Sequence, residues 1–292
     1  MERLLIAVAA GLLVSCSVKR HPLFQCPDMS PSRSVPTSEF VKPADIKVIA
    51  ALGDSLTSIG GHKTCQDVIT LPIFKLFNPN IIGASSGKTF LMTKTNFKSM
   101  GFNLAGLPLQ TRLLIERLKL YEGVNFEDDW KLLTILIGMN DICGYCRNKA
   151  LYSVDNYVHF IKVSLEMLMN EVPRMIVNVV QIVRMQSLRE AKKRTPGCFL
   201  QLQKRLEELL NSDRFFKKDF AVVLQPFLKD ADLPRLPNGK CDMTFFSADC
   251  FHISMKGHEE MAKGLWNNMF QPVGNKTTVT NFSKPIKLIC PP

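Results

Sequence analysis

The 292-residue sequence has no apolar run long enough to cross a membrane. A spanning helix needs about 20 apolar residues. The run Leu4–Val14 is far shorter, and the runs Leu132–Asn140 and Met175–Val183 are flanked by charged residues. The sequence also lacks the composition of a disordered, collagenous or coiled-coil chain, because 46% of its residues are apolar and 22% are charged. These absences predict a globular protein without a membrane span.

Acidic residues are scarce relative to basic ones. The chain has 26 Asp and Glu against 37 Lys and Arg, which gives a formal net charge of +11. The basic excess is widely spread, and its densest clusters are Arg189–Arg194 and Lys217–Lys218. Because nucleic-acid binding requires a sustained basic patch on one face, we expect no nucleic-acid partner. We interpret these residues as solvated surface, with a weak attraction to anionic lipid surfaces as the alternative.

The amino terminus has the features of a secretory signal peptide. The apolar run Leu4–Val14 follows Arg3 and precedes the small residues Ser15–Ser17. We expect residues 1–17 to be removed from a secreted chain, which removes Cys16 and leaves an even number of the nine cysteines. The alternative is a bacterial lipoprotein signal, in which a lipid on Cys16 would anchor the chain to a membrane.

Short apolar runs alternate with amphipathic segments after a Pro- and Ser-rich arm at residues 18–45. The expected strands, whose apolar character suits burial on both faces of a parallel sheet, are residues 46–52, 132–137, 175–183 and 220–224. The expected helices, which have apolar residues at helical spacing, are residues 109–121, 154–168, 199–210 and 255–270. This alternation predicts one α/β domain, residues 46–292, with a mostly parallel sheet.

A serine stands where the first expected strand ends. The run Ile46–Leu52 leads into Gly53-Asp54-Ser55. Ligands bind at the carboxyl ends of parallel strands, and the backbone N–H of a serine at the start of a helix can help to hold an oxyanion. Ser55 is therefore a candidate nucleophile. Helix capping is the alternative, because Asp and Ser are both favoured capping residues.

Asp249 and His252 form a second candidate pair, just before the helix expected from residue 255. A hydroxyl nucleophile needs a base with a near-neutral pKa, and an imidazole oriented by a carboxylate supplies one. Of the five histidines, His252 has this local carboxylate, and His258 is the second candidate base. The alternative for His252 is a buried histidine whose hydrogen bonds are satisfied.

Asn140 follows the expected strand at residues 132–137, within the segment Gly138-Met-Asn-Asp141. An asparagine at the carboxyl end of a central strand can donate its side-chain amide to an oxyanion. Ordinary turn formation is the alternative, because tight loops favour Gly, Asn and Asp.

In this order along the chain, the segments resemble the SGNH or GDSL hydrolases, a family of serine esterases, and within it the animal phospholipase B1 group. The resemblance covers nearly all of the chain after the signal segment and implies a three-layer α/β/α, flavodoxin-like fold. The segments that carry it are Phe24–Asp28, Pro43–Ile46, Ala50–Thr57, Asp129–Lys131, Ile137–Asp141, Asp219–Val223, Phe245–His252, Gly264–Asn268 and Pro272–Gly274.

The resemblance also implies a site and a substrate. Ser55 would be the nucleophile, His252 the general base and Asp249 the residue that orients His252. The oxyanion hole would comprise the N–H of Ser55, Asn140 and a glycine, for which Gly106 is the candidate. The implied substrates are phospholipids and lysophospholipids, met transiently at a membrane surface and cleaved at acyl esters without a metal or other cofactor.

Two departures from the family pattern leave other functions open. Gly106 comes two positions early relative to the family's Asn-x-Ala-x-x-Gly pattern, and the stretch after Thr57 is short. The alternatives are a catalytically impaired relative that binds lipid and an esterase for non-lipid esters, because one fold hosts many acyl substrates.

The cysteines are expected to form disulfides. Cys143 and Cys146 make a C-x-x-C pair, but the second pair typical of a structural zinc site is missing. In a secreted chain the candidates are Cys26, Cys65, Cys143, Cys146, Cys198, Cys241, Cys250 and Cys290, with Cys143–Cys146 and Cys241–Cys250 as local pairings. Two sequons predict glycosylation at Asn275 and Asn281.

Overall fold

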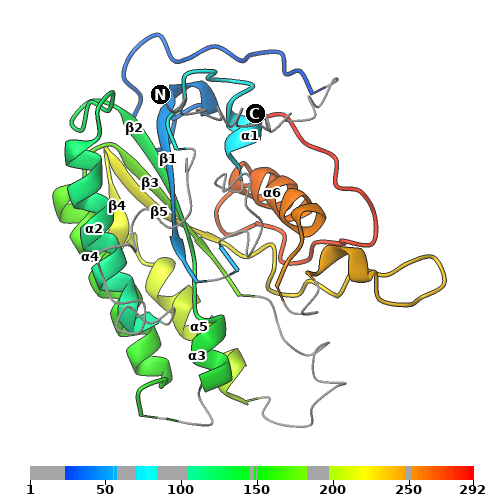
Figure 1. The fold of residues 1–292 in the computed structure, drawn as a ribbon. Helices are drawn as coiled ribbons and strands as arrows, with labels where there is room; N and C mark the ends of the chain where they lie inside the picture. Colours follow the sequence, from blue (N-terminus) through cyan, green and yellow to red (C-terminus); the bar gives the residue numbers. More distant parts are fainter. Residues whose placement is uncertain are drawn as a thin grey trace, which may run out of the picture.

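A sheet lies between two layers of helices in the computed structural model of the chain (Figure 1). The structure describes residues 24–54, 56–57, 70–83, 104–144, 148, 150–182, 197–247 and 252–292. Within these ranges the fold is the α/β class that the alternating sequence pattern predicts, with the three layers implied by the family resemblance.

The sheet contains strands β1 (Ile46–Gly53), β2 (Trp130–Leu136), β3 (Met175–Val180), β4 (Phe216–Lys217) and β5 (Phe220–Gln225). Their order is β1-β2-β3-β5-β4, and every pairing is parallel except that of β4 with β5. Ile82 forms a parallel bridge to Val48 on the other side of β1. The chain therefore visits one side of β1 before it adds β2 on the other, which makes the β1–β2 boundary a topological switch point.

The strands confirm the apolar runs read from the sequence, because all seven residues of β2 are buried, as expected for a strand covered on both faces. One boundary differs. β3 ends at Val180 rather than at Val183, because its neighbour β5 ends at Gln225, directly opposite Val180. With no partner beyond that register, the ladder stops.

The helices are α1 (Leu71–Phe74), α2 (Leu107–Leu120), α3 (Met139–Gly144), α4 (Val154–Glu171), α5 (Gly197–Leu210) and α6 (Met255–Met269). Short 3-10 helices span Pro43–Asp45, Leu104–Gly106, Asp213–Phe215 and Met243–Phe245. The four longest confirm the expected helices, whereas α1 and α3 are too short for periodicity to reveal. No helix in the described ranges is both long and apolar enough to span a membrane.

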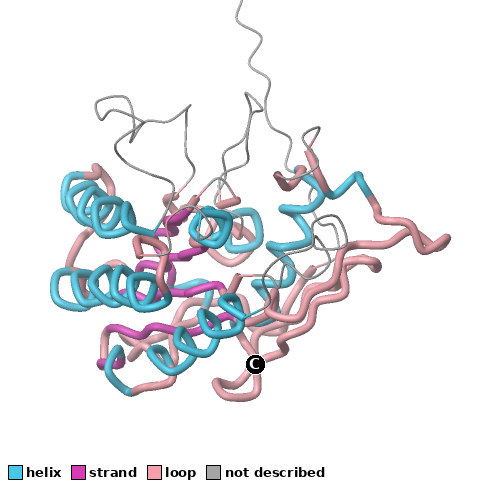
Figure 2. Tube along the Cα trace, turned by 90° about the horizontal axis from the view of Figure 1, so that it is seen from below, coloured by secondary structure: helices cyan, strands magenta, loops and turns pink. Residues whose placement is uncertain are grey.

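Helices α2 and α4 pack on one face of the sheet and α6 on the other; Figure 2 shows these layers from below. Leu133 of β2 faces the first layer, where it belongs to the same hydrophobic cluster as Ile115 and Leu165. Its neighbour Leu132 faces the second layer, where it joins the cluster around Trp266 of α6. The strict alternation of β2 between two apolar cores fixes the sheet as the central layer.

A disulfide between Cys26 and Cys290 joins the amino-terminal arm to the carboxyl-terminal segment. Beside it, the Trp266 indole N–H donates to Ile289 O at 2.8 Å. The Trp266 ring is fully buried and contacts the aromatic rings of Phe24, Phe74, Phe77 and Phe270. Both ends of the described chain are thereby fixed to α6.

Apart from Cys26 and Cys290, Cys241 is the predicted disulfide cysteine whose side chain lies within the described residues. Cys241 has a free thiol, which contradicts its predicted role in a disulfide. A disulfide requires two sulfur atoms about 2 Å apart, and among the described residues no other cysteine sulfur lies at that distance from Cys241. The remaining cysteines, or their side chains, lie outside the described residues: Cys65, Cys143, Cys146, Cys198 and Cys250.

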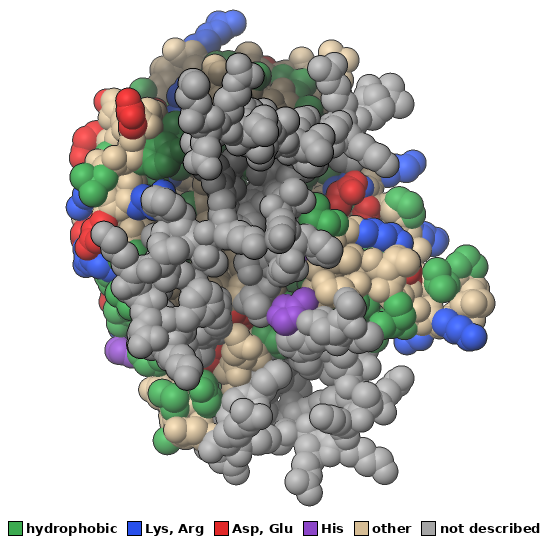
Figure 3. Space-filling model, in the orientation of Figure 1, with side chains coloured by type: hydrophobic (Ala, Val, Ile, Leu, Met, Phe, Trp, Pro, Cys, Tyr) green, Lys and Arg blue, Asp and Glu red, His purple; other side chains and the backbone are tan. Residues whose placement is uncertain are grey.

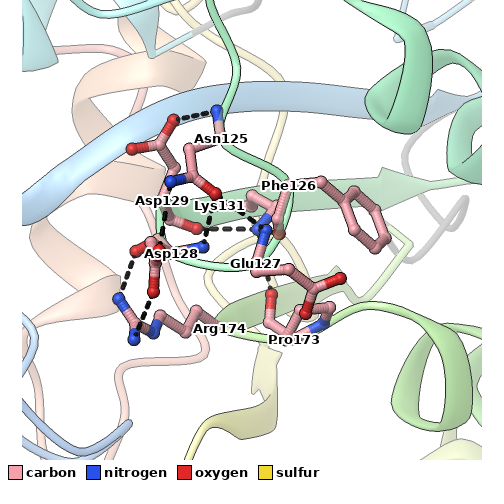
Figure 4. Close-up of polar contacts among 8 residues, drawn as sticks. All are labelled: Asn125, Phe126, Glu127, Asp128, Asp129, Lys131, Pro173 and Arg174. Carbon is pink, nitrogen blue, oxygen red and sulfur yellow. Dashed lines mark hydrogen bonds and ion pairs between the residues drawn. The ribbon is translucent and has the colours of Figure 1, made fainter.

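The amino end of β2 contains a buried ammonium group, Lys131, in a strand that is otherwise almost entirely apolar (Figure 4). Its Nζ donates to the backbone oxygens of Phe126, Asp129 and Pro173 at 2.5, 2.7 and 3.0 Å. Burial lowers the pKa of Lys131 to about 8, although nearby acidic residues oppose that change. Lys131 thus fixes the loop before β2 and the turn before β3 at the edge of the sheet opposite to the carboxyl ends.

Candidate active site

The candidate site begins where β1 and β2 end side by side. Gly53 is paired with Leu136 in the parallel register, so the residues that follow each strand emerge next to each other. The Gly53 N–H donates to Gln110 Oε1 of α2 at 3.1 Å, and the Thr57 hydroxyl donates to Leu136 O at 2.6 Å. These bonds fix the two ends of the segment that carries Ser55, which itself lies outside the described residues.

Asp54 holds this edge together from a buried position, with 3% of its surface exposed. Its carboxylate accepts the N–H of Leu56 at 3.0 Å and that of Gly138 at 3.3 Å. Burial raises the pKa of Asp54, whereas the N–H groups of Leu56, Gly138 and Met139 and the charge of His252 act to lower it. Asp54 therefore ties the end of β1 to the end of β2 within electrostatic reach of His252.

Gly138 makes the turn from β2 into α3 with a φ of +119°, in the region that favours glycine. A Cβ at this position would lie 2.7 Å from the Tyr157 ring and 2.8 Å from Ile182, so larger residues do not fit. The turn places half-buried Asn140 on α3, directly beyond the carboxyl end of β2. The tight-turn interpretation of this segment is therefore correct for Gly138, and it is compatible with the predicted role of Asn140.

Gly106 ends the 3-10 helix Leu104–Gly106 and directly precedes α2. The carboxylate of Asp141 accepts the Leu104 N–H with its two oxygens at 3.2 and 3.0 Å. Asp141 is 6% exposed, and burial raises its pKa to about 6, with a further increase from the charge of Asp54. The element that ends in Gly106 is thereby joined to the element that carries Asn140.

One buried phenol, that of Tyr157, lies within electrostatic reach of these carboxylates. Tyr157 of α4 has a pKa raised by burial and by the charges of Asp141 and Asp54. Asp54, Asp141 and Tyr157 thus share a site of low polarity, where electrostatic interactions are strong.

His252 lies just before α6, in a segment held to the 3-10 helix Met243–Phe245. Its backbone oxygen accepts the Ser247 N–H at 2.7 Å, and Phe246 pairs with Ile253. Ser254 caps α6 by accepting the Gly257 N–H at 3.3 Å. His252 is half-buried and its charge acts on Asp54, so the structure brings the His252 segment to the end of β1.

His258, the second candidate base, is buried between two backbone oxygens, and a neutral imidazole donates its one N–H to one of them. It is 4% exposed, with Nδ1 at 3.0 Å from Ser254 O and Nε2 at 3.2 Å from Leu56 O. Both ring nitrogens face backbone oxygens, so His258 joins α6 to the segment after Ser55 rather than serving as a free base.

The sequence did not reveal the structural role of Asp141, which follows Asn140 in the same motif, because a motif does not show whether a side chain is buried. Ser55 and Asp249 lie outside the described residues, so their predicted roles are not tested. In the part of the chain that the structure describes, no three His, Cys, Asp or Glu side chains gather in a way that could hold a metal ion.

The face of the molecule drawn in Figure 3 carries side chains of both charges. On the face drawn in Figure 3, Lys and Arg side chains are interspersed with Asp and Glu, and they form no continuous basic patch outside the grey region.

A three-layer, flavodoxin-like fold with these groups at the switch point of its sheet is the arrangement expected of an SGNH hydrolase. The chain belongs to the GDSL-like lipase/acylhydrolase family, whose model matches residues 49–265. By family it is classed with the carboxylic ester hydrolases.

The curated relatives include membrane-associated phospholipase B1 of Rattus norvegicus, Mus musculus and Homo sapiens. The rat protein is 37% identical over 92% of this chain, the mouse protein 35% over 96% and the human protein 38% over 92%. The chain spans about a fifth of the length of these relatives, or 22–23% of each.

Two solved structures share a weaker likeness. An acetyl xylan esterase, AlAXEase, gives a TM-score of 0.45 at 13% identity, covering 75% of this chain and 98% of its own. A GDSL-like lipase of Parabacteroides merdae gives 0.41 at 15% identity, covering 80% and 97%.

Proposed function

We propose that the chain is a secreted serine esterase that hydrolyses acyl esters of phospholipids and lysophospholipids. The observation that carries the proposal is the convergence of the His252 segment on Asp54, the neighbour of Ser55, at the switch point of the sheet. The similarity to phospholipase B1 of three mammals supports the choice of substrate.

In the proposed reaction, Ser55 Oγ attacks the ester carbonyl carbon while His252, oriented by Asp249, accepts the hydroxyl proton. The Ser55 and Gly106 N–H groups and the Asn140 amide stabilise the oxyanion. His252 then protonates the leaving alcohol. Water attacks the acyl-enzyme with His252 again as the base, which releases a fatty acid and regenerates Ser55.

Several features support secretion of a single domain, residues 46–292, after removal of residues 1–17. The Cys26–Cys290 disulfide is typical of oxidising compartments. Asn275 and Asn281 are both exposed, as acceptors of glycans must be. We propose that the enzyme meets its substrate by transient contact with a membrane surface.

The test compares the purified wild-type protein with Ser55→Ala. Both are treated with a serine-reactive fluorophosphonate and then assayed for fatty-acid release from phosphatidylcholine and lysophosphatidylcholine. We expect labelling and release with the wild type and neither with Ser55→Ala, while circular dichroism shows both to be folded.

Other outcomes separate the alternatives. Labelling that depends on Ser55 without phospholipid turnover would indicate a non-lipid ester, and acetylated sugars are then the next substrates to assay. Binding to phosphatidylcholine vesicles without any labelling would indicate a lipid-binding relative and would refute catalysis.

A further inference from the structure

The predicted oxyanion donors lie on two elements that are distant in the sequence. Gly106 precedes α2, and Asn140 lies on α3. Donors that stabilise one oxyanion must keep a separation fixed to within about 0.5 Å. Some contact must therefore hold the start of α2 against α3.

Asp141 makes that contact. Its carboxylate accepts the Leu104 N–H at 3.2 and 3.0 Å. Leu104 is two residues before Gly106, and Asp141 directly follows Asn140. Leu104 is fully buried, so water does not compete for this N–H. Leu104 begins the 3-10 helix Leu104–Gly106 that leads into α2, and the first N–H of a helix needs an acceptor outside the helix, which Asp141 supplies.

The choice of a carboxylate is costly for a residue that only caps a helix. Asp141 is 6% exposed, and its surroundings include the second buried carboxyl Asp54 and the buried phenol of Tyr157. A neutral Asn or Ser also caps helices well and would avoid burying a charge. A carboxylate is expected where a strong hydrogen bond must hold two segments of the chain together.

We propose that Asp141 is a positioning residue of the esterase, which sets the separation between the Gly106 N–H and the Asn140 amide. This inference rests on the proposed function. It assigns to Asp141 an effect on the transition state through its neighbours, without direct contact with the substrate.

The test uses Asp141→Ala, Asp141→Asn and a matched control, Glu260→Gln. Glu260 is a comparably buried carboxylate, 8% exposed, but it pairs with Lys263 of α6 and accepts the Ile286 N–H. Loss of one oxyanion donor lowers kcat by ~100-fold or more. We expect Asp141→Ala to lower kcat by about 100-fold with KM within about twofold, and Asp141→Asn to restore kcat to within about tenfold of wild type.

An alkylboronic acid, which forms a tetrahedral adduct with an active-site serine, supplies a readout that a structural role would not move. Its affinity should fall in parallel with kcat in the Asp141 variants and stay at the wild-type value in Glu260→Gln. Unchanged boronic-acid affinity in folded Asp141→Asn and Asp141→Ala would overturn the proposal, as would a rise in KM with unchanged kcat. Ester hydrolysis that persists in Ser55→Ala would instead refute the proposed function.

Discussion

Replacing Asp141 by Asn should make the protein more stable at neutral pH, even as it lowers activity. Asp141 is buried beside the Asp54 carboxyl, and its pKa in the folded chain is about 6 against an ordinary value of 3.8. A tenfold change in proton affinity corresponds to about 1.36 kcal/mol. The ionised Asp141 therefore costs the folded state about 3 kcal/mol.

The sign of the pH dependence follows from which state binds more protons. Below pH 3.8 the carboxyl is protonated in both states and the cost vanishes. Between pH 3.8 and about 6 the folded chain retains a proton that the unfolded chain has lost, so stability decreases as the pH rises. Above pH 6 the full cost applies.

Asparagine at this position keeps a neutral acceptor for the Leu104 N–H, and the pKa of about 6 already includes the charge-assisted bond that the ionised carboxylate makes. The net expectation for Asp141→Asn is a gain of about 3 kcal/mol at pH 7.5 and no gain near pH 3.5. Urea denaturation of both proteins at the two pH values measures this difference in unfolding free energy. A variant that is destabilised equally at both values would refute the conclusion that Asp141 is held at a cost.

Three other perturbations test parts of the fold that support the site. Replacing Cys26 and Cys290 together by Ser releases a crosslink between residues 264 apart; chain entropy sets an upper limit of about 5–6 kcal/mol on the loss, and reductant should reproduce it in wild type. Lys131→Met should cost about 2–4 kcal/mol at pH 7, because three backbone oxygens lose their donor. The pKa of Lys131 is about 8 in the folded chain against an ordinary value of 10.5, so the wild type should gain stability from this group as the pH rises from about 8 to 10.5, and Lys131→Met should not. An equal dependence of unfolding free energy on pH in the two proteins would contradict the burial of a charged Lys131. His258→Phe removes the contact with Leu56 O and should slow fluorophosphonate labelling by about tenfold in a folded protein, whereas an unchanged labelling rate would exclude a link from α6 to the serine segment.

The central sheet was predictable because its strands are buried on both faces. Continuous apolar runs at residues 46–52 and 132–137 correspond to β1 and β2 within two residues at each end. The helix α4 was equally predictable, because its apolar residues recur at helical spacing and the pattern ends before Pro173. By contrast, α3 could not be predicted, because a six-residue helix that begins with Met139 has too few turns to show a period.

The sequence proposes the residue types of the candidate site, and it does not reveal the contacts that support them. The order of the motifs points to Asn140 and His252, and local chemistry explains why these types suit an esterase. The role of His258 could not be read, because its partner Leu56 is 202 residues away in the sequence. The burial of Lys131 could not be predicted either, because a lysine within an apolar strand can be interpreted only once the carbonyl groups that accept its hydrogen bonds are known.

The buried acids at the switch point explain how the edge of a sheet becomes a rigid site. Beyond Gly53 and Leu136 the two strands no longer pair, so N–H groups of the departing segments need other acceptors. Asp54 supplies one for Leu56 and Gly138, and Asp141 supplies one for Leu104. Each carboxylate joins segments that the sheet itself can no longer hold. Neighbouring negative charges raise the cost of this arrangement, which is the pattern expected where geometry is maintained for catalysis at the expense of stability.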